Sequence, residues 1–80
     1  MLEQVRTIQN SCFHKNEVEK LYHNLLLENA MDSIHNRNKK SLLYAEEFLA
    51  NTIYLLELGM EQEARVQFDM VEYLFTQSQN

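Results

Sequence analysis

The chain has 80 residues, a formal net charge of −5, no proline, one glycine and one cysteine. That length allows one domain, residues 1–80, and the lone Cys12 excludes a disulfide within the chain and favours a reducing, cytoplasmic setting. The negative charge counts against nucleic-acid binding, because carboxylates repel a phosphate backbone.

The sequence shows no signal for secretion or for membrane insertion. Its first ten residues, MLEQVRTIQN, are polar and lack the apolar segment of a signal peptide. No run approaches the roughly 18 apolar residues that a membrane-spanning helix needs. We therefore expect no membrane partner.

The residue pattern predicts an all-α protein. Proline and glycine, which punctuate strands and turns, are almost absent, and no segment alternates polar and apolar residues for long enough to predict a strand. Apolar residues recur instead at helical spacing in residues 2–13, 17–35, 41–58 and 60–77. We expect a small bundle of three to four helices that ends in a long antiparallel helical hairpin and is completed by dimerisation.

The first predicted helix, residues 2–13, is short and amphipathic. A helix of this length frays in water unless it docks on another element, so we interpret it as a docking or swapping arm. Cys12, near its end, is more often a small buried hydrophobe than a nucleophile in such a segment.

The second predicted helix, residues 17–35, has an apolar stripe that changes direction halfway. Asn16 and Glu19 have the spacing of a capping box at its start. The stripe rotates near Leu26, and the apolar residues beyond it lie toward another side of the helix. We expect one end to pack on the first helix, and the other end on the central helix or on a second subunit.

The basic run HNRNKK, residues 35–40, follows this helix. Its asparagines favour turns, so we interpret it as a solvated loop. The alternative is a contact of Arg37, Lys39 and Lys40 with a phosphate or an acidic partner. Ser41 is suitably placed to cap the next helix.

The central helix, residues 41–58, is apolar on two sides. A step of about 100° per residue gives it one broad apolar face and a second, narrower stripe of Leu43, Ala50, Tyr54 and Leu58. A helix with two apolar sides is buried on two sides. The second stripe therefore packs either on another helix of the same chain or on a dimer mate or partner protein.

The last predicted helix, residues 60–77, follows Gly59, the only glycine. That position suits a left-handed residue at a helix C-terminus, which glycine adopts without a Cβ penalty. The helix has a wide apolar face, and we add its Tyr73 and Phe75 to the candidate anchors for a partner.

Residues 45–78 resemble a single tetratricopeptide-repeat hairpin. In the segment LELGMEQEARVQFDMV, Gly59 falls at the turn, Ala64 at the small crossing position and Phe68 at the aromatic position. Two further positions carry larger residues than the repeat usually has. The resemblance implies a helical hairpin that binds a protein or peptide and has no catalytic activity.

The sequence carries no catalytic motif. It has no HExxH, no glycine-rich phosphate loop and no GxSxG. Its cysteine and histidines lack the paired spacing of a zinc site. We therefore expect neither an enzyme, nor a metal, nor a cofactor.

The favoured hypothesis is a small helical regulator, inhibitor or adaptor that binds another protein and acts as a homodimer. A hydrophobic content of 45% in so short a chain is more than one small core can conceal. The alternative is a helical DNA-binding regulator that uses Arg6, Lys15, Lys20 and the basic run. A third hypothesis is an acidic DNA mimic, which requires the carboxylates of the second half to share one face.

Overall fold

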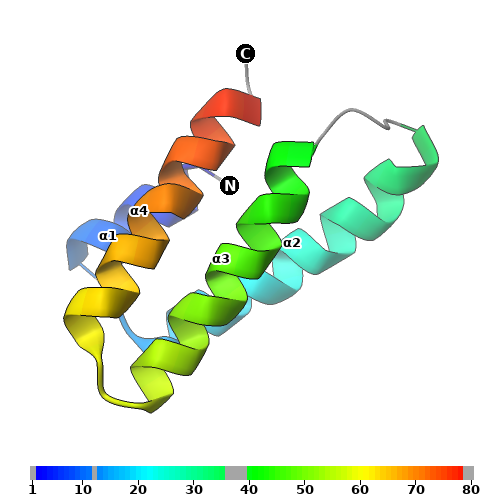
Figure 1. Cartoon of the computed structure of the whole chain (residues 1–80). Helices are drawn as coiled ribbons and strands as arrows, with labels where there is room; N and C mark the ends of the chain where they lie inside the picture. The colour runs from blue at the N-terminus through cyan, green and yellow to red at the C-terminus, as the bar shows by residue number, and fades with distance from the viewer. Residues whose placement is uncertain (1, 12, 36–39, 79–80) are drawn as a thin grey trace.

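A computed structural model describes residues 2–11, 13–35 and 40–78, with side chains for all of these except residues 32–35, 40 and 78. The described residues form four helices, α1 (Leu2–Ser11), α2 (Lys15–His35), α3 (Lys40–Glu57) and α4 (Glu61–Ser78), and contain no strand (Figure 1). The predicted all-α class is confirmed. Within this part of the chain, no helix is long and apolar enough to cross a membrane.

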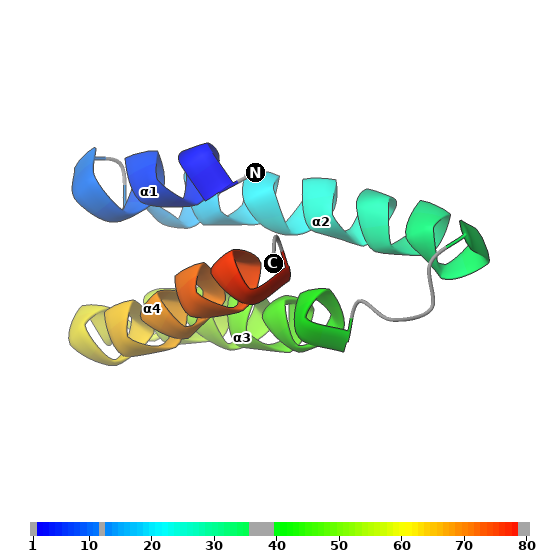
Figure 2. The same cartoon turned by 90° about the horizontal axis from the view of Figure 1, so that it is seen from above.

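The four helices are arranged in two layers. α1 and α2 form one layer, and α3 and α4 form the other (Figure 2). The most extensive packing joins α3 to α4, while α2 packs on α3 and α1 packs on α4 between the layers. α1 has 10 residues against the 21 of α2, and it lies beside the N-terminal half of that helix (Figure 2).

The core fills the space between the two layers. Its residues recur every three or four positions along each helix, which is the spacing of one helical face. The predicted broad face of the central helix is confirmed, because Leu42, Ala45 and Leu49 are buried there. The buried apolar side chains are Val5, Ile8, Phe13, Val18, Leu21, Leu25, Leu42, Ala45, Leu49, Ala64, Phe68, Val71 and Phe75.

Two polar side chains, Asn29 and Thr52, are also buried among the described residues. The amide nitrogen of Asn29 donates to the carbonyl oxygen of Leu42 at 3.1 Å and to the carboxylate of Glu46. The hydroxyl of Thr52 donates to the carbonyl oxygen of Phe48, one turn earlier in α3, at 2.8 Å. Both buried side chains therefore have hydrogen-bond partners, and Asn29 links α2 to α3.

The turn between α3 and α4 is a Schellman motif built on Gly59. Gly59 has a φ of 77°, in the left-handed region. Its N–H donates to the carbonyl oxygen of Leu56 at 3.1 Å, and the N–H of Met60 donates to the carbonyl oxygen of Leu55 at 2.9 Å. The predicted role of the only glycine is confirmed.

The predicted helix starts need correction. α2 begins at Lys15, which places Asn16 inside the helix, so the predicted capping box is wrong. The N–H of Val18 donates to the carbonyl oxygen of His14 at 3.0 Å, which moves the first hydrogen-bonded turn back to His14. Ser41 is likewise the second residue of α3 and does not precede it.

Replacement of Gly59 by alanine should lower the free energy of unfolding by about 1–2 kcal/mol, because a Cβ disfavours the left-handed conformation. No atom lies within 4 Å of the position that a Cβ would take, so the cost is conformational. Gly59→Asn should cost less, since asparagine tolerates this conformation better. Urea denaturation measures both variants, and an alanine variant as stable as the native chain would contradict the expectation.

Replacement of Asn29 by alanine should lower the free energy of unfolding by about 1–3 kcal/mol, because it removes a buried hydrogen bond to the carbonyl oxygen of Leu42 and a half-buried one to the carboxylate of Glu46. Asn24→Ala is the matched control, since Asn24 is exposed on the same helix, and it should change stability by no more than about 0.5 kcal/mol. Thermal and urea unfolding compare the two. Equal losses would show that the hydrogen bonds of Asn29 add nothing to stability.

Candidate interaction surface

The second apolar stripe of α3 lies on the surface. Leu43, Tyr54 and Leu58 are 55%, 61% and 54% exposed, and Ala50 is exposed between them. No described residue of the same chain covers them. The interpretation that this stripe packs on another helix of its own chain is therefore wrong for the described residues, and the alternative of a surface for a second molecule remains.

Polar residues interrupt the same exposed side of α3. Glu47 and Asn51 are exposed there, and neither side chain makes an ion pair or hydrogen bond with a described residue. Tyr44 is exposed at the edge of the stripe. This side of α3 therefore offers leucines and tyrosines for burial, together with a carboxylate and an amide that are free to bond to another molecule.

A second exposed apolar row runs along α4. Val66, Met70 and Tyr73 are exposed and are spaced by four and three residues, so they share one side of the helix. The prediction of Phe75 as a partner anchor is wrong, because Phe75 is 2% exposed and belongs to the core. It lies four residues after the buried Val71 and continues that buried row.

Exposed apolar residues also occur on α2. Leu27 and Met31 are exposed and lie one turn apart. The rotation of the apolar stripe near Leu26 was the signal for them in the sequence. Their exposure shows that these two side chains do not belong to the core between α2 and α3.

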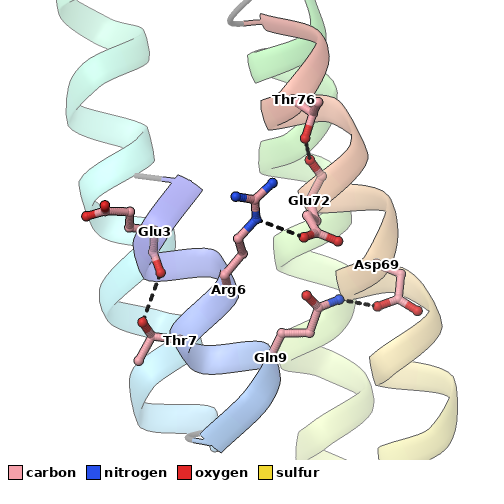
Figure 3. A network of polar contacts seen from close by, with 7 residues as sticks. All are labelled: Glu3, Arg6, Thr7, Gln9, Asp69, Glu72 and Thr76. Atoms are coloured by element: carbon pink, nitrogen blue, oxygen red, sulfur yellow. Dashed lines mark hydrogen bonds and ion pairs between the residues drawn. The ribbon is translucent and has the colours of Figure 1, made fainter.

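Charged and polar contacts hold α1 on α4 (Figure 3). They lie at the rim of the buried face of α1. The Nε of Arg6 lies 3.3 Å from a carboxylate oxygen of Glu72. The side-chain amide of Gln9 donates to the carboxylate of Asp69. These contacts place α1 against its own chain, with Val5 and Ile8 on the buried side.

Arg65 of α4 completes the contact with α1. Its guanidinium lies 4.5 Å from the ring centroid of Phe13, and its Nη1 donates to the carbonyl oxygen of Gln9 at 3.4 Å. The Phe13 ring meets the Phe68 ring edge to face, with centroids 5.4 Å apart. These residues and Asp69 line a pocket of about 180 Å³, which is smaller than the about 300–1,000 Å³ of ordinary ligand sites.

The lysines and arginines with described side chains each contact a carboxylate of the same chain. The pairs are Arg6 with Glu72, Lys15 with Glu57, Lys20 with Glu17 and Arg65 with Glu61, at 3.2–3.5 Å. Such pairing lowers the positive potential that a DNA backbone would meet. Arg37 and Lys39 lie outside the described residues, and Lys40 begins α3 without a described side chain.

The described residues contain no group of three or more histidine, cysteine, aspartate or glutamate side chains that could hold a metal ion. Comparisons of the chain with protein-family models, with curated proteins and with solved structures find no match. The tetratricopeptide-repeat resemblance thus stays a prediction. The exposed rows of α2, α3 and α4 are the candidate functional surface of the described residues.

Replacement of Arg65 by alanine should loosen α1 and lower the free energy of unfolding by about 1 kcal/mol, because it removes a cation–π contact with Phe13, which follows α1, and a hydrogen bond to Gln9 of α1. Lys20→Ala is the control, since it removes only an exposed pair within α2, and should cost at most about 0.5 kcal/mol. Urea denaturation gives the stabilities, and amide hydrogen exchange should quicken in α1 in the Arg65 variant alone. Unchanged exchange in α1 would contradict this role.

Proposed function

We propose that this chain is a small, non-enzymatic helical protein that binds another protein and modulates its activity, and that it acts as a homodimer. The observation that carries the proposal is the exposure of ordered apolar rows on separate helices, in particular the stripe of α3 and the Val66–Met70–Tyr73 row of α4. Exposed apolar patches of this kind mark surfaces at which proteins associate.

The spacing of the exposed side chains suits helix-to-helix recognition. Residues three or four apart form one continuous side of a helix, and such a side can enter the groove of a partner or pair with another helix. Tyr54 and Tyr73 suit this role, because a tyrosine buries a large ring while its hydroxyl keeps a polar contact.

Two rows allow two associations. We assign the α3 stripe to the second copy and the α4 row to the partner protein, so that a homodimer presents two partner-binding rows. The resemblance to a tetratricopeptide-repeat hairpin supports the protein-binding role, because it implies that residues of α3 and α4 form a hairpin unit that binds protein. We propose no catalytic residue and no cofactor, and we place the function in the cytoplasm because Cys12 is the only cysteine.

Replacement of Tyr73 by aspartate should weaken partner binding at least about tenfold, because truncation of a buried aromatic anchor commonly costs more than 1.4 kcal/mol of binding energy. The native chain is immobilised, captured proteins are identified, and each is purified for calorimetric titration. Asn24→Asp, which adds the same charge at an exposed position of α2, is the matched control.

The two variants decide the assignment of the α4 row. Loss of affinity in the Tyr73 variant together with an unchanged Asn24 variant supports it. Equal affinities of the native chain and the Tyr73 variant for every purified candidate would contradict it, and the effect of the chain on the activity of a bound protein tests the modulating role.

A further inference from the structure

The contacts that hold α1 on α4 follow one regular antiparallel register. Three pairs of side chains define this register: Arg6 with Glu72, Gln9 with Asp69, and Phe13, which follows α1, with Arg65. The first two pairs are drawn in Figure 3. Each step of three or four residues forward from α1 is matched by an equal step back along α4. α1 therefore lies lengthwise along a row of α4 and does not cross it at a single point.

α1 has the properties of a helical peptide bound to a partner. It is the most strongly amphipathic of the four helices. Its apolar residues Leu2, Val5 and Ile8 recur every three positions, and the last two are buried. A helix of ten residues is marginal in water on its own, so docking keeps α1 helical. Helix recognition between proteins uses the same spacing of apolar anchors.

α1 is also the least firmly attached of the four helices. Its packing on α4 and on α2 is the least extensive among the helix pairs in contact. The ion pair of Arg6 with Glu72 lies at an exposed rim, where the Arg6 side chain is 56% exposed, and such pairs stabilise a fold only weakly. Elements with few buried contacts open first in local unfolding. We therefore expect α1 to be released before the other three helices separate.

Release of α1 would uncover a surface of defined chemistry. Phe68, Val71 and Phe75 of α4 are at most 2% exposed, and they belong to the core that α1 completes. The carboxylates of Asp69 and Glu72, which bind the two polar side chains of α1, stand beside this row. The uncovered surface would thus be apolar along its length and acidic along one edge.

We infer that the surface under α1, which we call the α1 site, is a second protein-binding site that α1 covers as an intramolecular strap. Its occupant is an amphipathic helix of a partner protein that displaces α1. The pattern of α1 states the chemistry of this helix: apolar anchors every three or four residues, followed by an arginine or a carboxamide that reaches the acidic edge.

The inference goes beyond the proposed function, because it requires neither the homodimer nor the exposed row of α4. Opposite charge on the partner helix and on the acidic edge favours the correct partner and register. The strap lowers the apparent affinity in proportion to the fraction of chains in which the α1 site is open. Weakening of the strap should therefore strengthen the binding of a helix from outside.

Variants of α1 that leave the α1 site intact test this inference. Ile8→Asp places a charge in the buried face of α1 and should release it. The probe is a fluorescent peptide of residues 1–11 with the native sequence, and fluorescence anisotropy measures its binding. It should bind the Ile8→Asp chain at least about tenfold more tightly than the native chain. Asn10→Asp, which adds the same charge at an exposed position of α1, should leave the native affinity unchanged.

A reversible cross-link provides the opposite variant. Arg6→Cys combined with Glu72→Cys, in a Cys12→Ser background, places thiols where two native side chains meet, and a short reducible bis-thiosulfonate reagent joins them. The cross-linked chain should not bind the peptide, and a reductant should restore binding to the same protein. A peptide that carries Ile8→Asp is the control for the probe and should bind none of these chains.

Circular dichroism and amide hydrogen exchange show whether α2, α3 and α4 stay folded when α1 is released. If Ile8→Asp unfolds the whole chain, Arg6→Glu takes its place, because it sets like charges against each other at Glu72 and leaves the core unchanged. The peptide should then bind about threefold more tightly than it binds the native chain.

Tighter binding to the released chain and no binding to the cross-linked chain establish the inference. Equal binding to the native, released and cross-linked chains overturns it, and so does a folded, released chain that does not bind the peptide. Exchange in α1 as slow as in the other helices in every variant overturns the strap.

A native dimer that the cross-link within one chain dissociates would identify α1 of a second copy as the occupant and overturn the assignment to a partner protein. The Tyr73 experiment is decided separately, since Tyr73 is already exposed while α1 is docked. Failure of one proposal therefore leaves the other standing.

Discussion

The packing of α3 against α4 is the contact on which the rest of this structure depends. It is the most extensive helix pair, and α3 also receives α2. Thr52 sits in the buried face of α3 with its hydroxyl bonded to its own helix, so it adds no unpaired polar group to the core. Because α1 packs on α4 in turn, loss of the α3–α4 contact would divide the layer on which α1 and α2 both pack.

The parts of the fold that were predicted correctly rest on strong local signals. The buried face of α3 follows from a row of apolar residues at helical spacing, which tertiary packing rarely overrides over several turns. The prediction for Gly59 is equally reliable, because the backbone at this helix end requires a residue in the left-handed conformation. Both features depend on the residue and its close neighbours, and such information is present in a single sequence.

The errors arise where the answer depends on a neighbouring element. Helical spacing gives the direction of a side chain but not the helix that covers it. It could not show that the described residues leave Tyr54 exposed, or that Phe75 is buried while Tyr73 is exposed. The start of α2 was missed for a related reason, since Asn16 has a capping preference that the helix overrides by beginning earlier. Only part of the α4 row was predicted from the sequence. Val66 and Met70 stand close in the sequence to residues of the buried face, so they were not separated from it.

Size gives a physical reason why association at the exposed rows would stabilise this chain. A chain of 80 residues builds a core that rarely supplies more than about 3–5 kcal/mol of net stability. It carries neither an internal disulfide nor, among the described residues, a cluster that could hold a metal ion. A second molecule that binds the folded state and not the unfolded state adds stability by mass action. Burial of the α3 stripe would therefore remove apolar surface from water and reinforce the helix on which the core depends, so one contact would serve both fold and function.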